Sequence, residues 1–151
     1  LRMAERKYVV FKLDEEEYGI DIMRVKEVTE FVEVIKVPNT PHFVEGIINL
    51  RGEITPIINL KKRFSKPEET ANIAHRVLVL NLEDKLVGFM VDDASQVITM
   101  DDSQIQETPA IIAGEDKKYI EGIGKLEERM VIILDLVQVL NETEKKELLD
   151  M

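Results

Sequence analysis

The chain contains one unit of sequence twice. Residues 43–60 read FVEGIINLRGEITPIINL, and residues 119–136, which lie 76 positions later, read YIEGIGKLEERMVIILDL. The apolar pattern is kept, whereas the central Asn-Leu-Arg-Gly of the first copy becomes Lys-Leu-Glu-Glu in the second. Repetition at so long a period predicts two duplicated subdomains rather than a solenoid. The identical positions are Glu45/Glu121, Gly46/Gly122, Ile47/Ile123, Leu50/Leu126, Ile57/Ile133 and Leu60/Leu136.

The sequence that precedes each of these segments also repeats, at an offset of 69. Residues 8–22 and 77–91 each contain two short apolar runs around an acidic turn, which is typical of a β-hairpin. The repeat units therefore span about 7–65 and about 75–140, with additional residues in the second unit around 101–118. The matching positions here are Val10/Val79, Leu13/Leu82, Gly19/Gly88 and Val28/Val97.

Short strands separated by tight turns, in halves too small for a broad sandwich, favour a mainly β fold with two small closed barrels packed side by side. Asn59 and Asp135 are suitable residues to cap short helices after the last strand of each copy. The second of these is expected to extend as a C-terminal helix over about 136–150. Residues 21–28 have apolar residues at helix-like spacing and fit either a helix or a strand with a short helical turn.

Composition excludes several classes of function. The chain has 20 basic and 30 acidic residues, a net charge of −10, and no cysteine. An acidic protein is unsuited to bind the negatively charged phosphate backbone of DNA or RNA, so we expect no nucleic-acid partner. Disulfides, thiolate metal sites and cysteine nucleophiles are excluded. The apolar runs are much shorter than the ~20 residues that span a bilayer, so we expect a cytoplasmic protein without membrane insertion.

No arrangement of residues indicates an active site. The histidines, His42 and His75, are far from any nucleophile or metal motif. The acid pairs at 92–93 and 101–102 lack the alternating ligands of a calcium loop, so turns and helix caps are their expected use. We therefore expect no catalysis, cofactor or metal.

The remaining candidate feature is a surface turn. Arg51 lies between two apolar strands, where Gly52 is suited to the positive φ of a tight turn. Taken alone, Arg51 reads as a solvated turn residue and Glu27 as an ordinary exposed acid, while Phe31 and Phe43 are expected in the core.

The sequence resembles the CheW family of bacterial chemotaxis coupling proteins over about 8–142. The resemblance rests on Phe43-Val44-Glu45-Gly46-Ile47-Ile48-Asn49-Leu50-Arg51-Gly52 and the strand after it. It continues through Tyr18-Gly19-Ile20-Asp21-Ile22, Val25-x-Glu27-Val28, Val87-Gly88-Phe89-x-Val91-Asp92 and Arg129-Met130-Val131-Ile132-Ile133-Leu134.

This resemblance implies two SH3-like, five-stranded β-barrel subdomains within a single domain, residues 1–151, and no catalysis. It implies an adaptor that joins the cytoplasmic tips of methyl-accepting chemoreceptors to the regulatory domain of the histidine kinase CheA. It places coupling roles on Arg51, with Asn49 and Gly52 of the same turn, on Val25 and Glu27, and on Val97 of the second copy. Glu45 departs from relatives that carry a basic residue there.

Two alternatives stay open at this point. The same fold occurs as a regulatory part of CheA and of hybrid adaptors with a receiver domain, so the chain could be a domain excised from a larger protein. A β-barrel that binds a small ligand is an alternative of a different class.

Overall fold

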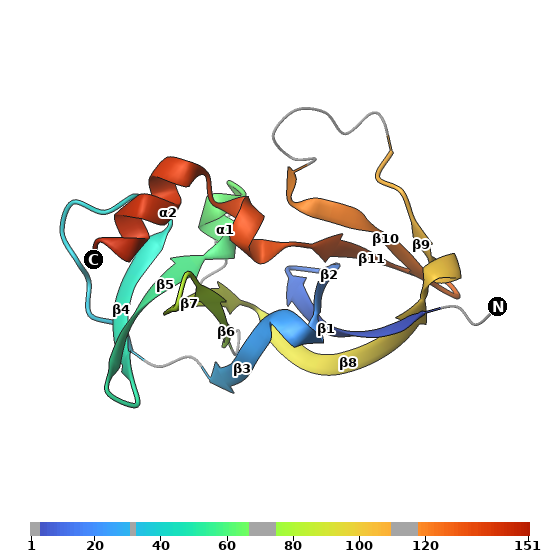
Figure 1. Cartoon of the computed structure of the whole chain (residues 1–151), viewed down its shortest axis with the longest axis horizontal. Helices are drawn as coiled ribbons and strands as arrows, with labels where there is room; N and C mark the ends of the chain where they lie inside the picture. Colours follow the sequence, from blue (N-terminus) through green and yellow to red (C-terminus); the bar gives the residue numbers. More distant parts are fainter. Residues whose placement is uncertain (1–3, 31–32, 67–74, 110–117) are drawn as a thin grey trace.

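The computed structural model describes residues 4–30, 33–66, 75–109 and 118–151, and the fold there is mainly β (Figure 1). Phe31, which was expected in the core, lies outside these residues. The strands are β1 (Glu5–Leu13), β2 (Glu16–Asp21), β3 (Val25–Glu30), β4 (Val44–Leu50), β5 (Glu53–Asn59), β6 (Arg76–Leu82), β7 (Lys85–Val91), β8 (Asp93–Asp101), β9 (Ile105–Gln106), β10 (Ile120–Leu126) and β11 (Arg129–Leu134). The helical segments are η1 (Ile22–Arg24), α1 (Leu60–Arg63), η2 (Asp102–Gln104), η4 (Leu136–Val139) and α2 (Glu142–Leu149).

The strands form two sheets that lie side by side (Figure 1). The six-stranded sheet has the order β8-β1-β2-β11-β10-β9, and the five-stranded sheet has the order β3-β6-β7-β5-β4. Neighbouring strands are antiparallel except for β2 with β11 and β5 with β7, which run parallel. The mainly β architecture with two sheets is therefore confirmed, although one sheet has a sixth strand because η2 separates β8 from the short β9.

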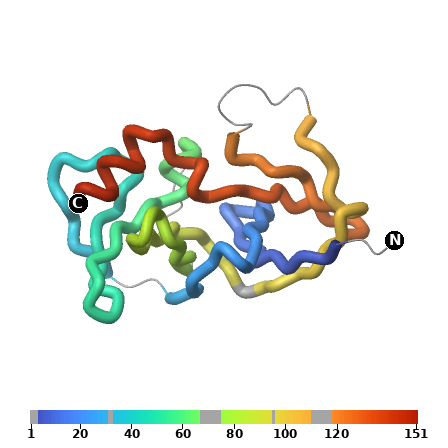
Figure 2. The backbone as a smooth tube through the Cα atoms, in the orientation of Figure 1, coloured from blue at the N-terminus to red at the C-terminus, as the bar shows by residue number. Residues whose placement is uncertain are grey.

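The predicted subdomain boundaries, 7–65 and 75–140, do not coincide with the sheets. Each sheet takes the hairpin of one copy and the later strands of the other: β1 and β2 pair with β8 and β11, while β6 and β7 pair with β3 and β5. The chain crosses between the sheets inside each copy, at η1 and at Asp92. Figure 2 traces the backbone through both sheets. The two copies have thus exchanged their hairpins. The repeat in the sequence shows which residues are equivalent, but it does not show which strands pair.

The exchange is reciprocal, and two glycines of the repeat mark it. Gly19 of β2 pairs with Ile133 of β11, and Gly88 of β7 pairs with Ile57 of β5. A Cβ on Gly19 would lie 3.1 Å from Ile133 Cδ1, and one on Gly88 would lie 2.5 Å from Ile57 Cδ1. Each glycine therefore makes room for the equivalent isoleucine of the other copy at the parallel pairing.

In each sheet the chain links the two ends of the strand order. In the six-stranded sheet, β8 leads through η2 into β9, so successive segments occupy the two ends of the strand order. In the five-stranded sheet, Ile35 follows β3 and forms an isolated bridge with Ile47 of β4. Both sheets thus approach the closure that protects the edges of a small barrel.

One buried apolar cluster is shared by both sheets, and each sheet also has a smaller cluster of its own. Phe11 and Ile20 of the six-stranded sheet belong to the same buried cluster as Leu78 and Phe89 of the five-stranded sheet. Leu148 of α2 joins this cluster, so the C-terminal helix packs on the core as well. Phe43 is 5% exposed and belongs to the core as predicted.

The helical segments agree with the sequence in part. Asn59 accepts a hydrogen bond from the Lys62 N–H and caps α1, whereas Asp135 makes no side-chain cap. The predicted helix over 136–150 is two elements: a 3₁₀ turn, η4, and then α2, which begins at Glu142 because Asn141 and Glu144 form a capping box. Residues 21–28 are a short helical turn followed by a strand, which was one of the two expected forms.

Within the described ranges, no helix combines the length and the apolarity that crossing a bilayer requires.

Candidate functional site

The candidate site is centred on the two-residue turn between β4 and β5. Arg51 and Gly52 form this turn with φ values of 50° and 89°, and Leu50 pairs with Glu53 on either side of it. The Asn49 side-chain oxygen accepts a hydrogen bond of 2.7 Å from the Gly52 N–H. A Cβ on Gly52 would meet nothing within 4 Å. Glycine is therefore suited to this position by its positive φ and not by a lack of space for a side chain.

The same backbone recurs in the other hairpins, but the side chain does not. The β1–β2, β6–β7 and β10–β11 hairpins also have two-residue turns, whose first residues are Asp14, Glu83 and Glu127. Their φ values are 57°, 47° and 53°. The left-handed first residue is therefore shared architecture, and Arg51 is the one cation among these four turn positions.

Arg51 forms a two-point ion pair with Glu27 of β3. Its Nη1 donates to Glu27 Oε2 at 3.1 Å, and its Nη2 donates to Glu27 Oε1. The Arg51 side chain is 66% exposed, and that of Glu27 is 26% exposed. The hydrogen bonds from Arg51 lower the pKa of the Glu27 carboxyl. A guanidinium has five N–H donors, so a paired arginine still presents donors to solvent.

The pair lies where the five-stranded sheet closes. β3 and β4 are the two ends of its strand order, and Arg51 directly follows β4. The ion pair thus joins the two ends through side chains, in addition to the backbone bridge between Ile35 and Ile47. Four of the predicted site residues (Asn49, Arg51, Gly52 and Glu27) are therefore brought together.

The two predicted valines lie elsewhere. Val25 is half-buried at the start of β3 and packs against the main core, so most of its side chain faces inward. Val97 is 53% exposed on β8, where it pairs with Val9 of β1 in the six-stranded sheet. The structure separates Val97 from the Arg51 turn by placing it on the other sheet.

Sequence reasoning missed the arginine that ties the corresponding part of the six-stranded sheet. Arg129, the first residue of β11, forms an ion pair with Glu17 of β2 and donates to the Gln96 side chain at 2.8 Å. Gln96 is the counterpart of Glu27 at the offset of 69. In each copy, an arginine of the second hairpin thus contacts the strand that follows the crossover: Arg51 contacts β3, and Arg129 contacts β8. The two arginines occupy different positions in the repeat.

Glu45, the departure noted in the sequence, has partners within the chain. It accepts a hydrogen bond of 2.9 Å from the Asn59 side chain and pairs with Lys62 at 2.8 Å. Burial acts to raise the pKa of Glu45, but these two donors outweigh it and the pKa is lowered. Glu45 therefore carries a stable negative charge that is already compensated.

The two acid pairs differ in use. Asp101 caps η2 through the Ser103 N–H and completes a capping box with Gln104, as expected. Asp92 is 7% exposed and pairs with Lys61, so it is a buried ion-pair partner rather than the turn or cap residue that was expected. Within the part of the chain that the structure describes, no three His, Asp or Glu side chains gather as metal ligands would.

Comparison with known proteins gives a consistent result. The family model described as CheW-like domain matches residues 7–144. Chemotaxis protein CheW of Treponema pallidum is 40% identical over 144 residues, covering 93% of this chain and 85% of that protein. The Klebsiella aerogenes protein of the same name is 37% identical over 139 residues, covering 92% and 84%. The crystal structure of scaffolding protein TtCheW from Thermoanaerobacter tengcongensis superposes with a TM-score of 0.83 at 38% identity, covering 93% of this chain and 96% of that one.

Proposed function

The chain belongs to the CheW-like family of non-catalytic chemotaxis scaffold proteins, and on that premise we propose that it couples chemoreceptor cytoplasmic tips to the regulatory domain of the histidine kinase CheA. The proposal also places it in the cytoplasm, at receptor arrays on the membrane. The sequence resemblance supports the proposed partners, and the geometry around Arg51 supports the proposed site.

The observation that carries the site is the exposed, pre-oriented guanidinium of Arg51. A two-point pair with Glu27 holds the side chain in one direction, and two-thirds of it is exposed. An arginine that is already ordered loses less side-chain entropy on binding than a free one. Its remaining donors suit a carboxylate or backbone carbonyls on a partner.

The second copy supports a partner role for Arg51 by contrast. Its equivalent turn residue is Glu127, which reverses the charge while keeping the left-handed backbone. The turn itself therefore does not require an arginine. We propose Arg51 and Glu27, framed by Asn49 and Gly52, as the contact on the five-stranded sheet.

The strands that follow the two crossovers, β3 and β8, carry exposed apolar residues that suit a second kind of contact. Val97 on β8 and its counterpart Val28 on β3 are 53% and 39% exposed. We propose Val97 as a contact on the six-stranded sheet, and Val25 as a residue that supports β3 from the core side.

Two separate titrations test the function. Immobilised full-length chain is titrated with a chemoreceptor tip fragment and, independently, with a CheA regulatory fragment. Saturable binding to both supports an adaptor. Binding to neither, with the chain shown to be folded by circular dichroism, would overturn the proposal.

A further inference from the structure

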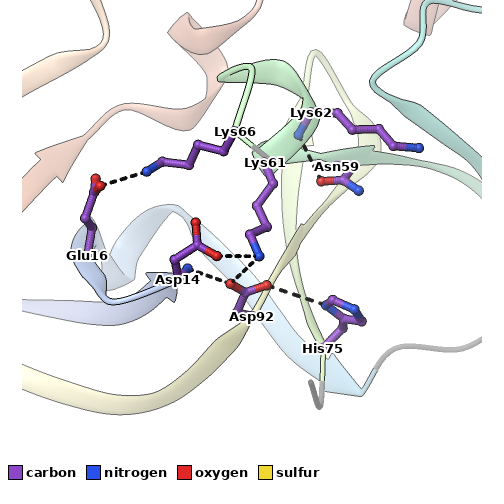
Figure 3. Close-up of polar contacts among 8 residues, drawn as sticks. All are labelled: Asp14, Glu16, Asn59, Lys61, Lys62, Lys66, His75 and Asp92. Atoms are coloured by element: carbon purple, nitrogen blue, oxygen red, sulfur yellow. Dashed lines mark hydrogen bonds and ion pairs between the residues drawn. The ribbon is translucent and has the colours of Figure 1, made fainter. Parts of the chain in front are cut away.

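A buried charged cluster lies where the two sheets meet (Figure 3). The Lys61 ammonium contacts Asp14 Oδ1 at 2.7 Å and Asp92 Oδ2 at 3.0 Å. The Asp14 N–H donates to the same Asp92 oxygen at 2.6 Å, and His75 Nδ1 lies 3.8 Å from the other. The side chains of Lys61 and Asp92 are only 6% and 7% exposed. These four residues are called the Lys61 cluster below.

Each member of the cluster comes from a different part of the fold. Asp14 lies in the β1–β2 turn of the six-stranded sheet, and Lys61 lies in α1, directly after β5 of the five-stranded sheet. Asp92 is the residue at which the chain passes from β7 in one sheet to β8 in the other. Its N–H donates to the Lys12 carbonyl of β1 at 3.0 Å. The ammonium therefore joins both sheets and the crossover between them.

The other crossover has a more exposed ion pair instead: Arg24 of η1 contacts Asp135 Oδ2 at 2.6 Å, and the Arg24 side chain is 46% exposed. At the offsets of the repeat, Asp14, Lys61 and Asp92 correspond to Glu83, Val137 and Met23. Val137 carries no charge and Met23 is 88% exposed, so these residues cannot reproduce the buried pair. The duplication thus supplied the backbone for two junctions, and among the residues that the structure describes the buried ammonium lies at one of them.

We propose that Lys61 is a positioning residue that fixes the angle at which the five-stranded and six-stranded sheets meet. Apolar contacts in the shared core are non-directional and allow packed layers to slide. An ammonium between two carboxylates favours one arrangement, because a shift would separate the Lys61 and Asp92 charges, whose side chains are only 6% and 7% exposed. This inference concerns the fold and holds whichever partner the Arg51–Glu27 pair contacts.

The neighbouring cation provides a matched control. Lys66, just beyond α1, pairs with Glu16 of β2 at 2.8 Å and so also links the two sheets. The Glu16 side chain is 56% exposed and that of Lys66 is 19% exposed, and an ion pair that water reaches contributes little. Lys66 reaches the same sheet as Lys61 but from the surface.

The test measures the distance between the sheets directly. Because the chain has no cysteine, Glu53→Cys on β5 and Lys125→Cys on β10 provide two exposed sites for spin labels. Electron–electron double resonance on the full chain should give one narrow distance distribution. Lys61→Met should broaden or shift it, whereas Lys61→Arg and Lys66→Met should leave it unchanged.

A compensated variant separates positioning from loss of folding. Lys61→Met combined with Asp92→Asn removes the uncompensated buried carboxylate, so its melting temperature should recover toward that of the parent. We expect its distance distribution to stay broad or shifted, because the ammonium is absent. A narrow, parent-like distribution in this variant, or an equal broadening by Lys66→Met, would overturn the inference.

Discussion

Arg51 and Glu27, 24 residues apart in sequence, meet as a two-point ion pair that joins the two ends of the five-stranded sheet. The sequence suggested these residues separately as exposed side chains on a contact surface. The structure makes them one unit, in which Glu27 orients the arginine. Their variants should therefore behave as a coupled pair.

The first prediction is non-additivity in binding. Glu27→Ala should weaken binding to a chemoreceptor tip fragment because it releases Arg51 from its fixed orientation, and Arg51→Ala should weaken it at least as much. The double variant should lose no more affinity than Arg51→Ala alone. Titration of the three variants by calorimetry measures this. Losses that simply add would show that the residues act independently.

The second prediction concerns pH. Because the Arg51 hydrogen bonds depress the pKa of Glu27 in the folded state, the stabilising contribution is present above the unfolded pKa, about 4.3. It is lost as the pH falls through the lower folded value. In Arg51→Ala the folded pKa should rise toward the ordinary value. An NMR titration of the Glu27 carboxyl carbon measures the pKa in the parent and in Arg51→Ala. An unchanged pKa in the variant would contradict the pairing.

The third prediction compares two glycines on one hairpin. A Cβ on Gly46 would lie 2.2 Å from the Ile35 carbonyl oxygen, and its φ is 149°, so Gly46→Ala must displace backbone. We expect a loss of at least about 3 kcal/mol in unfolding free energy. At Gly52, with open space and a φ of 89°, Gly52→Ala should cost about 1–2 kcal/mol of backbone strain. Urea denaturation measures both, and a reversed order would count against the packing described for β4.

The fourth prediction concerns the stability of the Lys61 cluster. Lys61→Met leaves the Asp92 carboxylate buried without its cation, which should cost about 3–5 kcal/mol. Lys66→Met removes a pair whose carboxylate is exposed, and its cost should stay within about 0.5 kcal/mol. Thermal and urea denaturation of the two variants provide the comparison. Equal losses would mean that burial does not distinguish the two cations.

Local features of this fold were predictable from the sequence. The hairpins, their acidic turns and the repeat offsets follow from apolar alternation and identity, which are properties of neighbouring residues. The start of α2 also carried a readable signal, because Asn141 and Glu144 have the spacing of a capping box. Asp135 was predicted as the cap instead, because an acid before an apolar run has the sequence pattern of a helix cap. Its side chain makes no capping hydrogen bond.

The exchange of hairpins was not predictable in this way. It depends on which distant strand pairs in parallel with β2 and β7, and an apolar strand fits many partners equally well. The Arg51–Glu27 pair and the Lys61 cluster depend on that pairing in turn. Lys61 lies in a run of cations that reads as a solvated surface, and only the folded chain shows that one of them is buried.

Arg51→Ala beside Glu127→Ala, each titrated against a chemoreceptor tip fragment, tests the central proposal most directly. A charge-assisted contact to a partner corresponds to about ten- to a hundredfold in affinity. We therefore expect Arg51→Ala to weaken binding by about that factor while its melting temperature stays near that of the parent, because the side chain is exposed. Glu127→Ala, at the same place in the other copy, should bind as the parent does. If Arg51→Ala instead bound normally and lost thermal stability, the arginine would serve to stabilise the five-stranded sheet. The proposed role in coupling would then be wrong.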